Sequence, residues 1–411
     1  MPHLRTANAS PAAFPAAAPS EAPPAVQALL NTADIRIGGS RPWDIQVHHS
    51  RLYERLLHEG SLGVGESYMD GDWDCPQLDQ LFDRVLRASV EPRLTGLARL
   101  KLVVTQVPDR LFNRNGRLRA FEIGERHYDI GNDLFERMLD THMVYSCGYW
   151  QRARNLHEAQ QNKLEMICQK LQLCPGMTLL DIGCGWGGLA RHAAQHHGVE
   201  VTGITVSREQ QAEAERRCSG LPVRILLQDY RDLQGSFDRI VSVGMFEHVG
   251  LRNHASYFRT AHRLLKAEGL FLLHTIGLDM AVAHTDPWID KHIFPGGKLP
   301  AAHEVAGAFE PWFVLEDWHN FGPDYDLTLM AWHQRFEEAW PELQPRYGER
   351  FGRMWRYYLL MCAGFFRSRQ GQLWQLMLTR RERRQVYRSV RPFSSAAPSD
   401  RAPDGTPTLT V

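Results

Sequence analysis

The feature that most constrains this chain is a glycine-rich segment at residues 179–190, which reads LLDIGCGWGGLA. An apolar run ends in Asp181, glycines follow at alternate positions, and the pattern then becomes helical. Glycine adopts positive φ easily and lets a ligand approach the backbone. Between a strand and a helix, such glycines form a cradle for a nucleotide at the helix N-terminus. The segment therefore predicts a cofactor that contains adenosine; the alternative is a tight turn without a ligand, which the density of glycines disfavours.

The next expected strand indicates which adenosine cofactor this is. The glycine segment also fits the GxGxxG pattern of dinucleotide enzymes, which place an acidic residue about 20 residues further on to bind the ribose. Residues 199–207 end instead in Thr205 and Ser207, without a carboxylate. Asp181 before the glycines would repel a phosphate, whereas it suits a cationic amino-acid group. S-Adenosylmethionine carries an ammonium and a sulfonium, so we favour it over NAD.

Composition restricts the class of protein. The chain has 411 residues, of which 43% are hydrophobic, and its formal net charge is zero. These values are typical of a globular protein with two or three domains, and they argue against nucleic-acid binding. No run of eighteen apolar residues occurs, so we expect no transmembrane helix. The seven cysteines lack CxxC or zinc spacing, which predicts reduced thiols, a cytoplasmic location and no metal site.

The pattern changes along the chain and indicates several units. The first residues are rich in Ala and Pro and lack the basic start and apolar centre of a secretory signal. Apolar residues at helical spacing follow at 78–86, and an arginine-rich stretch separates them from the remainder. We therefore expect a disordered leader at 1–27, a smaller, mainly helical N-terminal domain at 28–108, a linker at 109–120, a catalytic domain at 121–391 and a disordered tail at 392–411.

From about residue 121, strands and helices alternate. This predicts an α/β fold, a doubly wound Rossmann-like domain whose parallel sheet has helices on both faces. The end of the domain is rich in helix and in aromatic residues between Trp332 and Trp374, which form either an ordinary core or an apolar tunnel. Six arginines against one glutamate at 380–391 are either a solvated helix end or a patch for an anionic membrane. The expected strands are 177–182, 200–204, 223–227, 237–243 and 269–275, and the expected helices are 158–171, 187–197, 208–218 and 257–266.

Polar residues follow several strands at the carboxyl edge of the sheet, where open α/β sheets bind their ligands. Glu247 lies in an apolar run after the fourth strand, and His274 ends the fifth. A buried carboxylate needs a partner, so the two form a candidate acid–base pair, although a histidine that ends a strand is often structural. Cys147 is either a nucleophile or a structural residue. Asp229, after the third strand, either accepts from the adenine amine or is only a polar strand end.

A series of longer motifs resembles one family. In chain order they are residues 66–72, 128–134, 145–150, 181–188, 205–211, 227–233, 245–250, 272–277 and 318–322. The series resembles the bacterial cyclopropane-fatty-acyl-phospholipid synthases, within the cyclopropane and mycolic acid synthase family of S-adenosylmethionine-dependent methyltransferases, from about Gly63 to Arg380. Mycolic acid synthases are similar only from about residue 121, so the additional N-terminal domain favours the phospholipid enzymes.

The resemblance implies an activity and a set of site residues. Such enzymes transfer the methyl of S-adenosylmethionine to a cis double bond of a phospholipid acyl chain; aromatic faces can stabilise the carbocation, and bound bicarbonate removes a proton before the ring closes. Cys362 matches a family cysteine and is a candidate nucleophile, although alkene methylation needs no covalent adduct. The implied ligands of the bicarbonate ion are Cys147, Glu247, His274, the backbone of Ile276, and Tyr325. The cofactor contacts, with those of the glycine segment, are Tyr145, Ser146, Asp181, Gly183, Gly185, Gly187, Thr205, Gln210, Gln228 and Asp229.

The resemblance also implies partners. We expect unsaturated phospholipid in the bilayer as substrate, peripheral association with the inner face of the membrane through residues 28–108 and the terminal arginines, and a homodimer. Two alternatives stay open. The carbocation could be quenched to a methyl-branched or methylene product, or the chain could be a lipid-binding protein that retains a methyltransferase fold.

Overall fold

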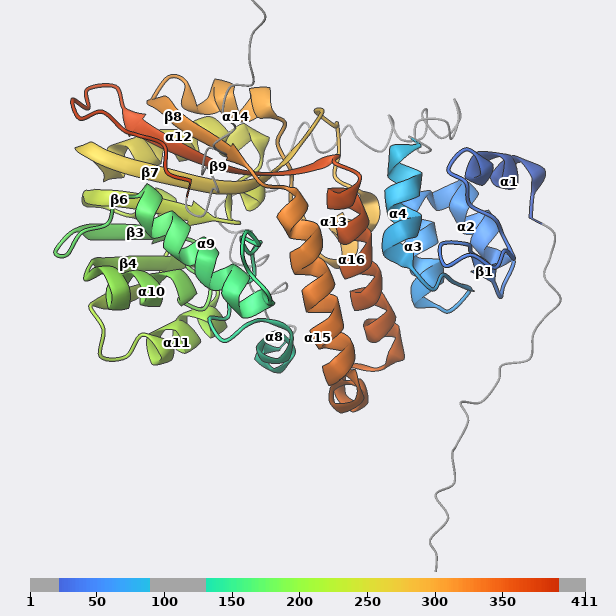
Figure 1. Cartoon of the computed structure of the whole chain (residues 1–411). Coiled ribbons are helices and arrows are strands. Elements are labelled where there is room, and N and C mark those ends of the chain that lie inside the picture. The colour runs from blue at the N-terminus through green and yellow to red at the C-terminus, as the bar shows by residue number, and fades with distance from the viewer. Residues whose placement is uncertain (1–21, 89–130, 392–411) are drawn as a thin grey trace, which may run out of the picture.

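The computed structural model describes residues 22–88 and 131–391. Three expected segments therefore lie wholly or partly outside the described residues: the first 21 residues of the leader, the linker at 109–120 and the tail at 392–411. Figure 1 shows a large α/β part, a pair of long helices beside it, and a small helical part at the far end.

A seven-stranded sheet organises the α/β part, in the order β5-β4-β3-β6-β7-β9-β8 (Figure 1). The five strands from β5 to β7 are parallel, as the sequence predicts, and each begins and ends within a few residues of its expected bounds. The doubly wound α/β prediction is therefore confirmed. The strands are β3 Thr178–Ile182, β4 Glu200–Thr205, β5 Val223–Leu227, β6 Phe237–Val243, β7 Leu265–Leu278, β8 Phe313–Asn320 and β9 Gly371–Arg380.

The sheet extends beyond the five predicted parallel strands at one edge, where the sequence pattern predicts no strand. Strand β9 lies between β7 and β8 and pairs antiparallel with both. Residues 373–379 are all buried, so β9 lacks the alternation of polar and apolar residues that marks a half-buried strand. The sequence pattern of this segment therefore does not distinguish a buried strand from the helices that precede it.

Helices cover both faces of the sheet. Helices α9 (Leu156–Lys170) and α10 (Gly188–His197) pack on one face, and α12 (His254–Leu264) and α14 (Ala302–Phe309) pack on the other. Side chains alternate along a strand, so neighbouring residues of β3 enter different cores. Helix α11 (Arg208–Arg217) contacts β4 and β5. Short elements complete this part: α8 Asn132–Met138, η2 Tyr230–Asp232, η3 Phe246–His248, η4 Leu251–Asn253 and α13 Pro287–His292.

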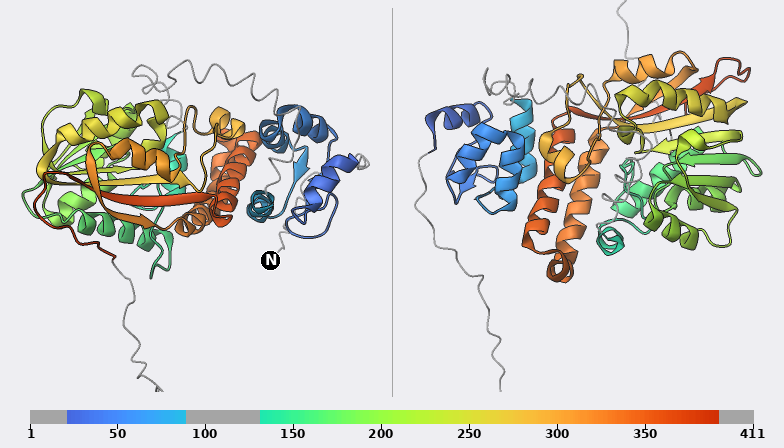
Figure 2. Two further views of the ribbon diagram at one scale, coloured as in Figure 1. Left: turned by 90° about the horizontal axis from the view of Figure 1, so that it is seen from above. Right: turned by 180° about the vertical axis from the view of Figure 1, so that it is seen from behind.

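The aromatic residues near the end of the chain belong mainly to a pair of packed helices, α15 (Pro323–Tyr347) and α16 (Glu349–Arg367), seen from further sides in Figure 2. Trp332, Phe336 and Trp355 are buried in a core that these helices share with α8. Of the two interpretations of these aromatic residues, an ordinary core and an apolar tunnel, this packing supports the ordinary core. Residues 381–391 form turns and irregular structure, so their interpretation as a helix end is wrong.

The N-terminal part packs directly on this helix pair. Helix α4 (Leu78–Arg87) lies against α16, and the two parts share one continuous hydrophobic cluster. Arg367 of α16 pairs with Asp79, and Arg350 pairs with Asp70. Helix α1 begins at Pro24, so the expected ordered start at residue 28 is too late. The elements are α1 Pro24–Asn31, β1 Gln46–Val47, α2 Arg51–Glu59, α3 Ser61–Met69, β2 Trp73–Asp74 and α4 Leu78–Arg87.

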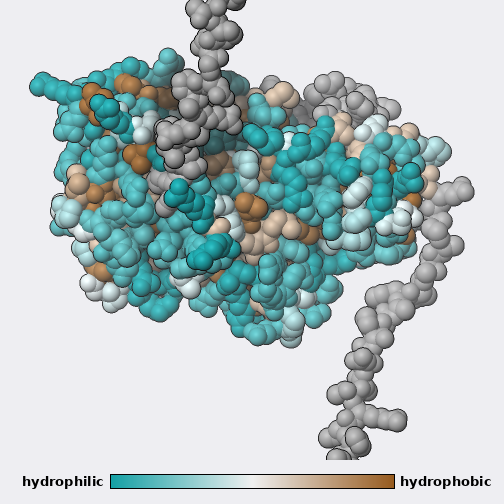
Figure 3. Space-filling view, viewed as in Figure 1, coloured by the Kyte–Doolittle hydropathy of each residue, from teal (hydrophilic) through white to brown (hydrophobic). Residues whose placement is uncertain are grey.

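The surface seen in Figure 3 is mainly hydrophilic, with scattered hydrophobic side chains. Across residues 22–88 and 131–391, none of the helices combines the length and the apolar character needed to cross a bilayer.

Candidate active site

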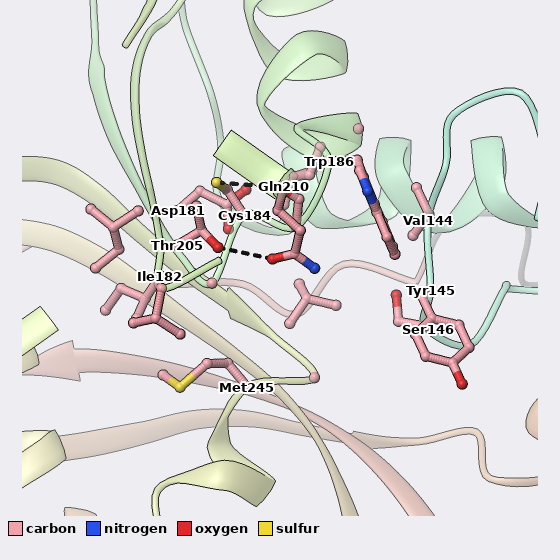
Figure 4. Close-up of a pocket in the computed structure, with 18 of the residues that line it drawn as sticks. Val144, Tyr145, Ser146, Asp181, Ile182, Cys184, Trp186, Thr205, Gln210 and Met245 are labelled. Carbon is pink, nitrogen blue, oxygen red and sulfur yellow. Dashed lines mark hydrogen bonds between the residues drawn. The ribbon is translucent and has the colours of Figure 1, made fainter. Parts of the chain in front are cut away.

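A pocket opens at the carboxyl ends of β3 to β6, between these strand ends and the segment 143–146 (Figure 4). Nine of the ten residues expected to contact the cofactor line it, although they come from distant parts of the sequence. Lys163, Trp186, Met245 and His248 also line it and were not expected. The nine residues are Tyr145, Ser146, Asp181, Gly183, Gly185, Thr205, Gln210, Gln228 and Asp229.

The glycine loop has the backbone conformation that its sequence predicts. Gly183, Gly185 and Gly187 have φ of 86°, 54° and 80°, a region that favours glycine. A Cβ at Gly183 would lie 2.8 Å from the Met245 side chain, whereas a Cβ at Gly185 would meet no atom of the described residues within 4 Å. Gly187 does not line the pocket and instead precedes α10 as its N-cap. Gly185 therefore leaves space beside the backbone, while Gly187 serves the turn.

Asp181 lies at the end of β3 and is 2% exposed. Burial raises the pKa of its carboxyl group to about 7, an effect that nearby Lys163 partly offsets. The Lys163 Nζ donates to Ser146 Oγ at 2.8 Å, and burial lowers the pKa of this amine to about 8. A carboxyl group in these surroundings gains a favourable partner when a cationic ligand binds, which fits the ammonium of S-adenosylmethionine.

The ends of β4 and β5 supply polar groups to the same pocket. Thr205 Oγ1 donates to Gln210 Oε1 at 2.8 Å, and Ser207 caps α11 by accepting from the Gln210 backbone N–H. Both carboxylate oxygens of Asp229 are engaged by the Arg231 guanidinium, at 2.8 and 2.6 Å. If Asp229 accepts from the adenine amine, it therefore does so while it also pairs with Arg231.

Helix α9 fixes the segment that closes the pocket. Gln160 Nε2 donates to the Ser146 carbonyl at 2.8 Å, beside the bond from Lys163. The hydroxyl groups of Tyr145 and Tyr358 are 2.7 Å apart. Gln160 and Lys163 were not predicted as site residues from the sequence. A lysine among the apolar positions of an amphipathic helix could have indicated Lys163, because a buried ammonium needs partners.

Glu247 lies next to the cofactor pocket on η3, between lining residues Met245 and His248. Its Oε1 accepts from the Ile276 backbone N–H at 2.7 Å, whereas its Oε2 is buried without a hydrogen-bond partner among residues 22–88 and 131–391. Burial raises the pKa of this carboxyl to about 7. The backbone of Ile276, expected to contact the anion, thus donates its N–H to Glu247 in this structure.

The other implied anion ligands surround the same region. Cys147, Ile276 and Tyr325 belong to one small apolar cluster that also contains Phe321, and the ring of His274 lies 5.7 Å from that of Phe321. Burial holds the pKa of the Cys147 thiol and of the Tyr325 hydroxyl well above their ordinary values and that of His274 well below its own. These groups are therefore neutral donors near neutral pH.

The two cysteines differ in their surroundings from reactive thiolates. The Cys147 thiol donates to the Gly148 carbonyl at 3.1 Å and lies 3.7 Å from Thr328 Oγ1. Burial raises the pKa of Cys362, on α16, to about 12. A nucleophilic cysteine requires a depressed pKa, so both environments disfavour that role.

The sheet, glycine loop and pocket together define the class: this is the fold of the class I S-adenosylmethionine-dependent methyltransferases. The cyclopropane synthase MmaA2 of Mycobacterium tuberculosis is similar at 34% identity and a TM-score of 0.59, over 63% of this chain and 97% of that one. The mycolic acid cyclopropane synthase CmaA1, solved with SAH and CTAB, is similar at 32% identity and the same TM-score, over 63% and 97%.

The chain belongs to the mycolic acid cyclopropane synthetase family, whose model matches residues 116–376. It is 57% identical over 352 residues to the cyclopropane-fatty-acyl-phospholipid synthase of Escherichia coli strain K12, covering 86% of this chain and 92% of that protein. It is also 31% identical over 387 residues to a probable fatty acid methyltransferase of Pseudomonas putida, covering 87% of this chain and 94% of that protein.

Proposed function

We propose that this chain is a cyclopropane-fatty-acyl-phospholipid synthase. It would transfer the methyl of S-adenosylmethionine to a cis double bond of a phospholipid acyl chain, and loss of a proton would then allow the ring to close. The similarity to the Escherichia coli enzyme carries this proposal, because it extends over 86% of the chain, whereas the similarity to the mycolic acid enzyme MmaA2 covers 60%. The buried acid–base group beside the pocket supports it.

S-Adenosylmethionine would supply an electrophilic methyl group. The chain would bind its ammonium through Asp181 and accommodate the remainder along Gly183, Gly185 and Thr205. Because an alkene is a weak nucleophile, holding the two reactants in line and in contact is the main contribution of the site. The closed, apolar surroundings of Cys147 and Tyr325 would exclude water from the cation that develops.

We propose that bicarbonate acts as the base, bound next to Glu247. The unpartnered Oε2 atom is the observation that supports this assignment, because a buried polar atom without a partner is costly. A protonated Glu247 can donate to an anion, which removes the like-charge repulsion expected from a carboxylate. Tyr325 and His274 would supply further N–H or O–H donors.

Turnover with defined lipid tests the activity. The purified protein is incubated with labelled S-adenosylmethionine and vesicles of cis-unsaturated phospholipid, and the acyl chains are analysed by mass and against a cyclopropane standard. A gain of one carbon and two hydrogens that co-elutes with the standard is expected, with a slower rate in bicarbonate-depleted buffer. A methyl-branched or methylene product would favour the fatty acid methyltransferase alternative, and no gain in mass would favour a lipid-binding protein.

We also propose peripheral association with the inner face of the membrane, and a homodimer that light scattering at micromolar concentration would detect. Leu57 on α2 is 59% exposed, and Met280, in the loop after β7, is 71% exposed. The arginines at 380–391 are less available: Arg381 donates to the Glu310 carbonyl, and Arg383 to that of Glu268. We therefore assign docking mainly to the N-terminal domain and the loop at 280–282.

A further inference from the structure

A row of buried polar side chains crosses three strands behind the candidate active site. His274 of β7, Gln375 of β9 and His319 of β8 are direct partners in the strand register, so their side chains lie on the same face of the sheet. Gln375 Nε2 lies 3.1 Å from His274 Nδ1. Lys170, the last residue of α9, reaches this row, with its Nζ 2.8 Å from Gln375 Oε1 and 3.0 Å from His319 Nδ1.

When Lys170 is charged, the row has only one consistent arrangement of donors and acceptors. Burial lowers the pKa of Lys170 to about 7, and the Asp317 carboxylate at 4.0 Å favours the charged form. An ammonium only donates, so the oxygen of the Gln375 amide then faces Lys170. The amide nitrogen then faces His274, and it can only donate. The Nδ1 atom of His274 is therefore an acceptor, and a neutral ring carries its proton on Nε2. Reversing the amide would place two donors, the amide nitrogen and Lys170, against each other.

These side chains are buried, so the arrangement of their donors and acceptors decides which tautomer of His274 forms. Lys170 and Gln375 are 0% exposed and His274 is 1% exposed. Burial holds the pKa of His274 well below its ordinary value, and Lys163, Lys170 and His319 act in the same direction. The ring is therefore neutral, and its tautomer decides which atom can donate. No hydrogen bond reaches Nε2 from the residues that the structure describes. The proposed function places an anion beside Glu247 and the ring of His274, and such an anion would find an N–H on Nε2 only in this tautomer.

We propose that Gln375 and Lys170 are positioning residues that hold His274 in its Nε2–H form, so that the ring donates to the anion bound beside Glu247. The role of this donor rests on the proposed function, whereas the tautomer itself does not. Neither residue contacts the cofactor pocket, and each acts through His274.

The Gln375→Glu variant tests the proposal, because a carboxylate has nearly the same shape and can only accept. It pairs with Lys170 and draws the ring proton to Nδ1. Nitrogen-15 NMR of histidine-labelled protein, assigned by comparison with His274→Gln, should show Nε2–H in the wild type and Nδ1–H in the variant. Turnover should fall by about 10- to 100-fold, with the affinity for S-adenosylhomocysteine changed by less than about twofold.

Two further variants complete the experiment. Lys170→Met frees the amide to reverse, so it should produce a mixture of tautomers and a smaller loss. Gln372→Glu is the matched control, because Gln372 lies in the same strand with its side chain bonded to Asn320 at the surface, and it should keep both the spectrum and the turnover. Thermal unfolding shows whether each variant is folded.

A wild-type ring protonated at Nδ1 would overturn the proposal, as would full turnover in a folded Gln375→Glu protein whose Nε2 proton is lost. An unchanged histidine spectrum in Lys170→Met would show that Lys170 does not help to hold the tautomer of His274. The NMR measurement needs no substrate, so it remains decisive if the wild type forms no cyclopropane, a result that would contradict the proposed function instead.

Discussion

Glu247 is the residue on which the proposed proton transfer most depends. Glu247→Gln keeps the size of the side chain and an oxygen for the Ile276 N–H, but removes the ionisable proton. We expect turnover to fall by about 100-fold or more, as for the loss of an acid–base group, with nearly unchanged affinity for S-adenosylhomocysteine measured by calorimetry. Glu310→Gln, at an exposed position, is the control. Wild-type turnover in Glu247→Gln would exclude Glu247 from the mechanism.

Asp181 should make the stability of the ligand-free protein depend on pH. Its pKa is about 7 in the folded state against 3.8 for an ordinary carboxyl, so folding favours the protonated form. This contribution stabilises the fold in acid and is lost as the pH rises from about 4 through about 7. Between about pH 5 and pH 8, the wild type should lose on the order of 1–3 kcal/mol more unfolding free energy than Asp181→Asn.

Denaturant unfolding at the two pH values measures this difference. Adding S-adenosylmethionine should stabilise the wild type at the higher pH and have little effect on Asp181→Asn, because the variant lacks the partner for the ammonium. Equal pH dependence in the two proteins would show that Asp181 is not the titrating group.

At the scale of elements, the contact between α4 and α16 depends on Gly364. A Cβ there would lie 2.6 Å from Phe82 Cβ and 2.7 Å from the Asp79 carbonyl, so one helix must shift. We expect Gly364→Ala to lower the unfolding free energy by about 1–3 kcal/mol. Gly307→Ala is the matched control, because Gly307 is also helical but, in the part of the chain that the structure describes, no atom lies within 4 Å of an added Cβ. The control should be neutral or stabilising by up to about 1 kcal/mol, and equal effects would contradict this account.

Some of these elements could be predicted from the sequence and others could not. The strand, glycine loop and helix around Asp181 are encoded by neighbouring residues, so their order and the pocket at that edge could be predicted. Strand β9 could not, because residues 373–379 are uniformly buried and their pairing with β7 and β8 joins segments far apart in the sequence. Lys170 and Gln375 were missed for the same reason.

At the scale of the whole molecule, membrane docking should depend on exposed apolar residues more than on the arginines at 380–391. The double variant Leu57→Asp/Met280→Asp should reduce co-sedimentation with anionic phospholipid vesicles by about tenfold. It removes apolar contact with the bilayer and adds negative charges that the anionic lipids repel. The control is Val386→Asp, since Val386 is 84% exposed and belongs to the segment after β9. The sheet that contains β9 lies away from α1–α4 (Figure 1).

These substitutions preserve the core that the N-terminal part shares with α16, which a deletion of that part would open. Unchanged sedimentation of the double variant, with a loss for Val386→Asp, would move the docking surface to the arginine-rich segment.

The sequence by itself determined the alternating α/β pattern, the glycine loop with its preference for a cationic cofactor, and the family resemblance. Each of these depends on residues close together in the chain, where spacing reflects local backbone geometry. Only the tertiary structure decided the antiparallel edge of the sheet, the shared core of the two parts, the unpartnered oxygen of Glu247 and the row from Lys170 through Gln375 to His274. These depend on burial and on contacts between distant segments, which local patterns do not record.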